Sequence, residues 1–180
     1  MRPASVAALV LLLPLFARAA DKPVVVKVGK LAAAAPTEWA AEKPSNTLRS
    51  YQFKLPGAKD GPGDGELYVM PEGRKAADVF PRWRASFVPP EGKTADDIGK
   101  VRKLDGAKGA TIDLLDATGT WRYKERPFDP KAKEELRDDY RVLWVVVGDG
   151  DDTMHLRLSG PRETVDKYAP GFEAWLKSLK

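Results

Sequence analysis

Hydrophobic and polar residues alternate along residues 48–55, which predicts a strand with one buried face. Residues 66–70 predict the next strand, because apolar and β-branched residues follow a Gly-rich stretch. The connecting residues 57–65 contain four glycines and a proline, a composition typical of a long turn. We therefore expect these two strands to form an antiparallel hairpin.

Residues 141–147 are apolar at every position after the first, which is typical of a central strand covered on both faces. Residues 148–152 are Gly and Asp only and predict a hairpin loop. Residues 153–159 then alternate, and the pattern places His155 on the polar face of the returning strand.

The other strands are less clearly patterned. They are predicted at residues 23–28, 97–105, 109–115 and 118–124. Residues 30–46 are rich in Ala and Pro and predict a loop or a short helix. Residues 125–139 are charged and contain two prolines, so we expect an excursion with at most one helical turn.

Apolar residues recur every three or four positions in two stretches, which predicts two helices. The first covers residues 79–87, with Asp78 as its N-cap and Pro81 in its first turn. The second opens at Pro161 and carries an apolar stripe to the C-terminus, with a break expected near Ala169 because Pro170-Gly171 follows. The predicted fold class is α+β, a mostly antiparallel sheet flanked by helices in an α/β/α sandwich.

The N-terminus has the three parts of a cleavable signal peptide: Arg2, an apolar run at residues 6–16, and small residues at Ala17 and Ala19. The apolar run is shorter than the roughly 20 residues that span a bilayer. We therefore expect residues 1–19 to be removed, residues 20–46 to form an N-terminal strand and Ala/Pro-rich segment, and residues 47–180 to form one domain. The expected location is the periplasm or the cell exterior, with no membrane span after cleavage.

Composition excludes several classes of site and partner. The chain has no cysteine, so disulfides, thiolate zinc sites and cysteine nucleophiles are excluded. Without the signal peptide the chain has 28 basic and 26 acidic residues, a net charge of +2. Because the two signs are interspersed, no concentrated basic face is available to bind nucleic acid.

Several segments of the chain resemble uncharacterised exported bacterial proteins and, through them, the PsbP/DcrB-like superfamily. They are LRSYQFKLP, GDGELYVM, PRWRASF, GTW and the closing HLRLSGP…FEAWLKSLK. The resemblance covers residues 48–180. It implies an antiparallel sheet between helices that serves as a binding or assembly module without a shared catalytic centre, and it assigns no site residue to this chain.

Catalytic groups are sparse. His155 is the one histidine, and no serine lies in a nucleophile-elbow context, so a hydrolase triad is not indicated. One His and no Cys do not form a zinc shell. Acidic residues crowd one loop at Asp60, Asp64 and Glu66, but the sequence does not select the pair that a glycoside hydrolase requires.

A second acidic loop contains Asp149, Asp151 and Asp152, whose hard oxygens suit calcium. Their spacing does not match an EF-hand, because Thr153 and Met154 stand where a further acid and the turn glycine would be. A hairpin turn explains the same residues without metal. The sequence therefore predicts no cofactor, and a calcium ion in this loop is the alternative.

Aromatic residues give the remaining ligand candidates. Trp83, Trp144 and Trp175 lie on apolar faces and are predicted to be core residues. Candidate ligand contacts are Trp39, in the Ala/Pro-rich segment, and Trp121 and Tyr123, which alternate with Arg122 and Lys124.

The hypotheses for function differ in class. The first is an exported, non-catalytic binding or assembly module for an unknown envelope protein or small ligand. The second is a carboxylate-dependent hydrolase acting on an envelope polymer, and the third is a calcium-stabilised module.

Overall fold

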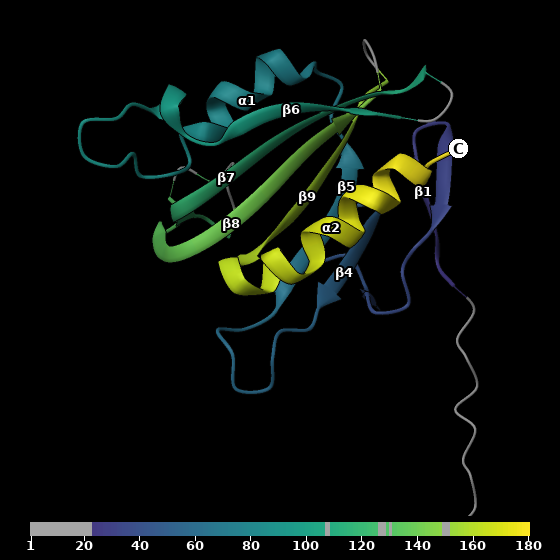
Figure 1. The fold of residues 1–180 in the computed structure, drawn as a ribbon, viewed down its shortest axis with the longest axis horizontal. Coiled ribbons are helices and arrows are strands. Elements are labelled where there is room, and N and C mark those ends of the chain that lie inside the picture. Colours follow the sequence, from purple (N-terminus) through teal and green to yellow (C-terminus); the bar gives the residue numbers. More distant parts are fainter. Residues whose placement is uncertain (1–22, 107–108, 126–128, 130, 149–151) are drawn as a thin grey trace, which may run out of the picture.

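The computed structural model describes residues 23–106, 109–125, 129, 131–148 and 152–180 (Figure 1). The predicted signal peptide lies outside these residues. The described chain forms a seven-stranded antiparallel sheet packed against two helices, an α+β fold. The predicted class, a mostly antiparallel sheet with helices, is confirmed at this level.

The elements follow one another in a simple order. The sheet strands are β3 (Ala40–Glu42), β4 (Tyr51–Leu55), β5 (Gly65–Pro71), β6 (Lys100–Asp105), β7 (Thr111–Tyr123), β8 (Glu135–Val147) and β9 (Met154–Pro161). They lie in the order β3-β4-β5-β9-β8-β7-β6. The remaining elements are the hairpin β1 (Val25–Val28) and β2 (Leu31–Ala34), the helices α1 (Ala76–Arg84) and α2 (Arg162–Ser178), and the 3₁₀ turn η1 (Ala95–Asp97).

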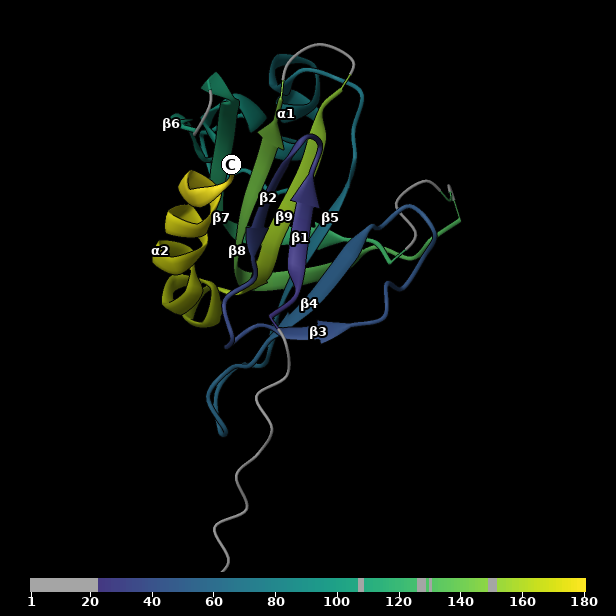
Figure 2. The same ribbon diagram turned by 90° about the vertical axis from the view of Figure 1, so that its right-hand side faces the viewer.

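The helices contact opposite faces of the sheet, because successive residues of each central strand point to opposite sides. On β8, Leu143 and Val145 join the core beneath α2, whereas Val142 and Trp144 join the core beneath α1. The β1–β2 hairpin completes the core on the α2 face (Figure 2). Since β8 is buried on both sides, its prediction as a central strand is confirmed.

A β-bulge bends the long β7–β8 pair. The strand register shifts between Gly119 and Trp121. Gly119 has φ +146°, a backbone conformation that residues other than glycine rarely adopt. Beyond the bulge, residues 120–123 and 135–138 form an extension that we call the β7–β8 arm. Figure 2 shows this arm turning away from α2.

Several segments differ from the sequence prediction. Residues 30–46 contain β2 and β3 instead of a helix, because β2 pairs with β1 and Ala32 exchanges backbone hydrogen bonds with Lys180. Residues 109–124 are mostly one strand, since the bulge lets β7 continue through Gly119. The last third of the 125–139 excursion, residues 135–139, belongs to β8, where pairing with β7 overrides its high charge.

Both helices also differ from their predictions. Helix α1 begins three residues early, so Lys75 is the N-cap and Asp78 lies in the first turn, where a carboxylate is favourable to the helix dipole. Helix α2 continues through Pro170 without the expected break. A proline removes one helical hydrogen bond, but Ala169 and Phe172 on either side are buried against the same sheet face and hold the helix together.

Neither helix in the described part of the chain is long and apolar enough to cross a membrane.

Candidate ligand-binding site

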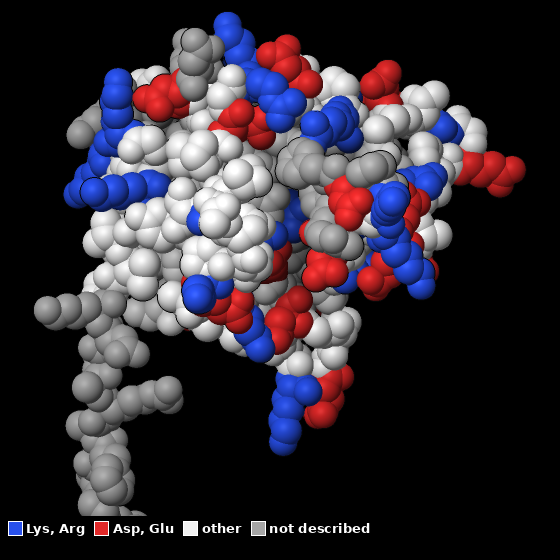
Figure 3. Space-filling model, turned by 180° about the vertical axis from the view of Figure 1, so that it is seen from behind, with Lys and Arg blue, Asp and Glu red and all other residues white. Residues whose placement is uncertain are grey.

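Helix α1 covers only part of its sheet face, and the uncovered part is hollowed (Figure 3). Glu66 and Tyr68 on β5, and Arg157 and Ser159 on β9, alternate with residues of the core beneath α2 and therefore point to the α1 face. The strand register pairs Tyr68 with Arg157 and Glu66 with Ser159. Side chains from two strands therefore meet on one surface of the sheet, where Glu66 and Arg157 are partly buried and Tyr68 and Ser159 are buried.

This surface and the β7–β8 arm enclose a cavity of about 180 Å³. We call it the arginine–aromatic hollow. It is defined by six of its lining residues: Glu66, Trp121, Tyr123, Arg137, Tyr140 and Arg157. Asp64 and Ser159 also line it.

Glu66 lies between two guanidinium groups. Arg49 Nη1 donates to Glu66 Oε1 at 2.6 Å, and Arg157 Nη2 donates to Oε2 at 3.0 Å. The central guanidinium carbons of both arginines lie over the Tyr68 ring, at 4.2 and 4.5 Å from its centroid. Stacking on a ring leaves the in-plane N–H groups of an arginine available to acceptors at its edge.

A third guanidinium group, that of Arg137, is held by aromatic residues of β7 and β8. The guanidinium carbon of Arg137 lies 3.5 Å from the Tyr123 ring centroid and 5.6 Å from that of Tyr140. Trp121 packs edge-on against Tyr123 with ring centroids 5.2 Å apart. Arg137 also donates to Glu135, so the arm fixes this cation at the wall of the hollow.

The hollow has more hydrogen-bond donors than acceptors. Among the described residues, the guanidinium groups of Arg49 and Arg157 make three hydrogen bonds, two to Glu66 and one to Gln52. Arg157 Nε is buried and has no partner in the described part of the chain. Each arginine side chain is 14% exposed, so its remaining N–H groups are only partly accessible.

The other carboxylate at the hollow, Asp64, is held ionised. A hydrogen bond from Lys54, followed by one from the Gly57 N–H, lowers the pKa of Asp64 below its usual value. Asp64 therefore acts as a hydrogen-bond acceptor at neutral pH.

No protein-family model and no curated protein sequence matches the chain. PA94 from Pseudomonas aeruginosa, a protein of unknown function, is similar in structure. The TM-score is 0.43 at 12% sequence identity, and the match covers 88% of this chain and 96% of that chain. The resemblance to the PsbP/DcrB-like superfamily therefore stays a prediction.

The structure brings together two of the three aromatic residues singled out in the sequence. Trp121 and Tyr123 both line the hollow. Trp39 instead lies in the core beneath α2, where it is 5% exposed and contacts Phe53 and Trp175. Its position leaves Trp39 no accessible ring face for a ligand.

The acidic candidates are also separated. Asp64 and Glu66 line the hollow, while Asp60 is exposed in the loop before them. Asp149 and Asp151 lie outside the described residues, and Asp152 is exposed. Within the residues that the structure describes, no three His, Cys, Asp or Glu side chains form a group that could hold a metal ion.

His155 is buried, contrary to the polar exposed position that alternation predicted. Helix α1 covers this end of β9, and Trp83 stacks on the imidazole with ring centroids 4.3 Å apart. The His155 side chain is 6% exposed, and its Nδ1 lies 3.9 Å from Glu72 Oε2. Burial, reinforced by the nearby positive charges of Arg157 and Arg74, lowers the pKa of His155 well below its usual value.

Sequence reasoning missed Arg49, Tyr68, Arg137, Tyr140 and Arg157. A partial signal existed, because Glu66 and Tyr68 alternate with apolar residues along one strand. Alternation gives the face of each residue within its own strand. It does not give the register between strands, which places Tyr68 opposite Arg157.

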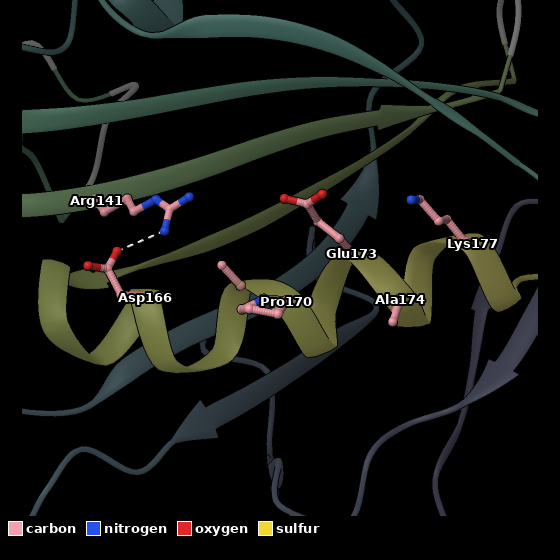
Figure 4. Close-up of a pocket in the computed structure, with 7 residues that line it drawn as sticks. Arg141, Asp166, Pro170, Glu173, Ala174 and Lys177 are labelled. Carbon is pink, nitrogen blue, oxygen red and sulfur yellow. Dashed lines mark hydrogen bonds and ion pairs between the residues drawn. The ribbon is translucent and has the colours of Figure 1, made fainter.

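A larger cavity of about 430 Å³ lies on the α2 face, between that helix and the strands beside it (Figure 4). Arg141 crosses this region. It donates to both oxygens of Asp116, at 2.9 and 2.7 Å, and to Asp166 on α2 at 2.7 Å. Glu173 is likewise paired with Arg102, so these charges serve to attach α2 to the sheet.

We expect Arg141→Gln to lower the free energy of unfolding by about 1–3 kcal/mol, because it removes a bidentate ion pair that is 20% exposed. The hydrogen bonds that Arg141 donates to Asp116 raise the pKa of Arg141, in keeping with a favourable ion pair. Urea unfolding measures the change. Arg122→Gln, which removes an exposed pair with Glu134, is the control and should cost less than about 1 kcal/mol.

Proposed function

We propose that this protein is an exported, non-catalytic binding module that holds an anionic ligand in the arginine–aromatic hollow. The observation that carries the proposal is the surplus of guanidinium donors around one carboxylate. Arg49 and Arg157 share Glu66, and most of their N–H groups have no acceptor among the described residues. A ligand carboxylate or phosphate would supply those acceptors in charge-assisted bonds.

The fixed geometry of the hollow supports binding. Both arginines are stacked on Tyr68, and Arg137 is stacked on Tyr123, so little side-chain freedom is lost when a ligand arrives. Apart from Arg49, which lies just before β4, the side chains come from β5, β7, β8 and β9, which are parts of one hydrogen-bonded sheet.

Two observations weigh against the alternative of a carboxylate-dependent hydrolase. A glycosidase needs one carboxylic acid with a raised pKa to protonate the leaving group. At the hollow, Asp64 has a lowered pKa, and both oxygens of Glu66 accept from arginines. The carboxylates here are better suited to hold cations and accept hydrogen bonds.

Export and the finer fold relationship are part of the same proposal. The charged, apolar and small-residue regions before residue 20 support cleavage and export. The antiparallel sheet with a helix on each face supports a PsbP/DcrB-like sandwich. In that setting the partner would be an envelope protein or a small ligand.

Isothermal titration calorimetry with hexaglutamate, trigalacturonate and pyrophosphate tests anion binding. We expect at least one probe to bind, and to bind more weakly as salt is added, since charge interactions are screened. Arg49→Gln should reduce its affinity about tenfold, because Arg49 pairs with Glu66 beside the hollow, and its loss leaves that carboxylate less neutralised and more repulsive to an anion. Arg49 lies just before β4, so its loss should leave the sheet intact.

Two further variants make the test specific. Glu66→Gln should raise anion affinity, because it removes the competing carboxylate. Arg122→Gln is the matched control, since Arg122 is on β7 but is not among the residues that line the hollow. The proposal is wrong if no probe binds at millimolar concentration, or if the affinity is the same in all three variants.

A further inference from the structure

The chemistry of the hollow distinguishes between kinds of anion. Its lining contains donors at Arg137 and Arg157, acceptors at Asp64 and Glu66, and a hydroxyl at Ser159 that does both. A phosphate or an acidic peptide side chain presents acceptors only, and two carboxylates in the wall would repel it. A ligand that carries one carboxylate and several hydroxyl groups satisfies both halves of the lining.

We infer that the ligand is a carboxylated sugar, one uronate residue of an acidic polysaccharide. The inference rests on the proposed function and specifies its ligand. The uronate carboxylate lies against the guanidinium groups of Arg157 and Arg137, which line the hollow and whose planar N–H groups match its two oxygens. Arg49 does not line the hollow, but its ion pair with Glu66 offsets the charge of that carboxylate. The ring hydroxyls donate to Asp64 and Glu66.

The aromatic wall supports a sugar ring. Tyr123 and Tyr140 are half-buried and both line the hollow, and Arg137 covers one face of the Tyr123 ring. The C–H face of a pyranose is apolar and packs on such rings, while its hydroxyl edge reaches the polar groups around them. A phosphate has no apolar face and would leave these rings unused.

The volume of the hollow limits the enclosed part of the ligand to one sugar unit. Its volume of about 180 Å³ is below the roughly 300–1,000 Å³ of sites that enclose a drug-sized molecule. Figure 3 shows the hollow opening at the molecular surface. One sugar ring therefore enters, and the neighbouring units of the polymer stay outside.

The test compares four oligomers by isothermal titration calorimetry with the mature protein: trigalacturonate, its methyl ester, trimannuronate and hexaglutamate. We expect a uronate trimer to bind at least about tenfold more tightly than the ester and hexaglutamate, a difference of about 1.4 kcal/mol. Arg49→Gln should weaken this binding about tenfold. Tyr123→Ala and Asp64→Asn should each weaken it several-fold.

The controls separate this inference from the proposed function. Tyr123→Phe keeps the ring and should bind as the wild type does, and Arg122→Gln should have no effect. If hexaglutamate binds more tightly than both uronates, and Arg49→Gln weakens its binding, the proposed anion site is supported and the sugar inference is overturned. It is equally overturned if Tyr123→Ala and Asp64→Asn leave uronate affinity unchanged. If no probe binds, both proposals are wrong.

Circular dichroism of each variant shows whether it is folded. Should Asp64→Asn lose its fold, Ser159→Ala replaces it, because Ser159 also lines the hollow and offers a hydroxyl to the same ligand. A full affinity for uronate in folded Ser159→Ala and Tyr123→Ala together would again contradict the inference.

Discussion

Replacing Trp175 with alanine is expected to lower the free energy of unfolding by about 3–5 kcal/mol. Trp175 is 5% exposed, and its ring lies 5.3 Å from Trp39 and 6.2 Å from Phe172, measured between centroids. Its indole Nε1 donates to the Ala34 carbonyl at 3.0 Å. The substitution therefore opens a cavity and also removes the bond between α2 and the β1–β2 hairpin.

Urea unfolding followed by circular dichroism measures this loss. Lys177→Ala is the control on the same helix, because Lys177 is exposed and its replacement should change stability by less than about 0.5 kcal/mol. Trp175→Phe should give an intermediate loss, since it keeps a ring and removes the hydrogen bond. A loss below about 1 kcal/mol for Trp175→Ala would show that α2 is not held by this contact.

Lowering the pH from 7.5 to 5.0 is expected to destabilise the protein through His155. Burial keeps the folded pKa of His155 well below the value of about 6.5 that the unfolded chain has. Below pH 6.5 the unfolded chain therefore binds a proton that the folded chain does not. Stability falls as pH falls, by up to about 1.4 kcal/mol per pH unit for one proton, until the folded pKa is reached.

The variant His155→Phe isolates this effect. Phenylalanine keeps a ring against Trp83 and cannot bind a proton, so its stability should fall less between pH 7.5 and 5.0 than that of the wild type. The comparison at pH 7.5 gives the packing cost of the substitution alone. Carboxylates titrate in both proteins, and their contribution cancels in the difference. Equal losses in the two proteins would mean that His155 titrates normally in the folded state.

The proposed ligand site depends on both helices indirectly. Helix α2 and the β1–β2 hairpin bury one face of the sheet, and the polar residues of β5 and β9 lie on the other face. Helix α1 then covers the end of that face around His155 and leaves the region of Glu66 and Arg157 open. Because α1 is short, it covers only part of this face and leaves space for a ligand.

Sequence patterns identified the strands whose alternation was regular. The strands predicted at residues 48–55 and 66–70 are observed at 51–55 and 65–71, and they form the predicted antiparallel pair, β4 and β5. The prediction failed where a distant partner decides the structure. Ala-rich β2 is a strand because β1 and the C-terminal Lys180 supply its hydrogen bonds, and no local pattern contains that information.

The residues of the candidate site were likewise predictable from the sequence only in part. Trp121 and Tyr123 were recognised as ligand candidates because aromatic and basic residues alternate around them. Arg157 looked like an ordinary exposed residue of an alternating strand, and its role depends on Glu66 and Arg49, which lie 91 and 108 positions away in the chain.

The sequence by itself determined the α+β class, the central position of residues 141–147 and the absence of thiol chemistry, because these follow from local periodicity and composition. Only the tertiary structure decided that His155 is buried, that Trp39 belongs to the core and that Arg137 and Arg157 meet aromatic rings in one hollow. Period-two alternation assigns a residue to a face of its strand. Which neighbour lies beside it, and whether a helix covers it, depends on strand register and on packing between distant segments.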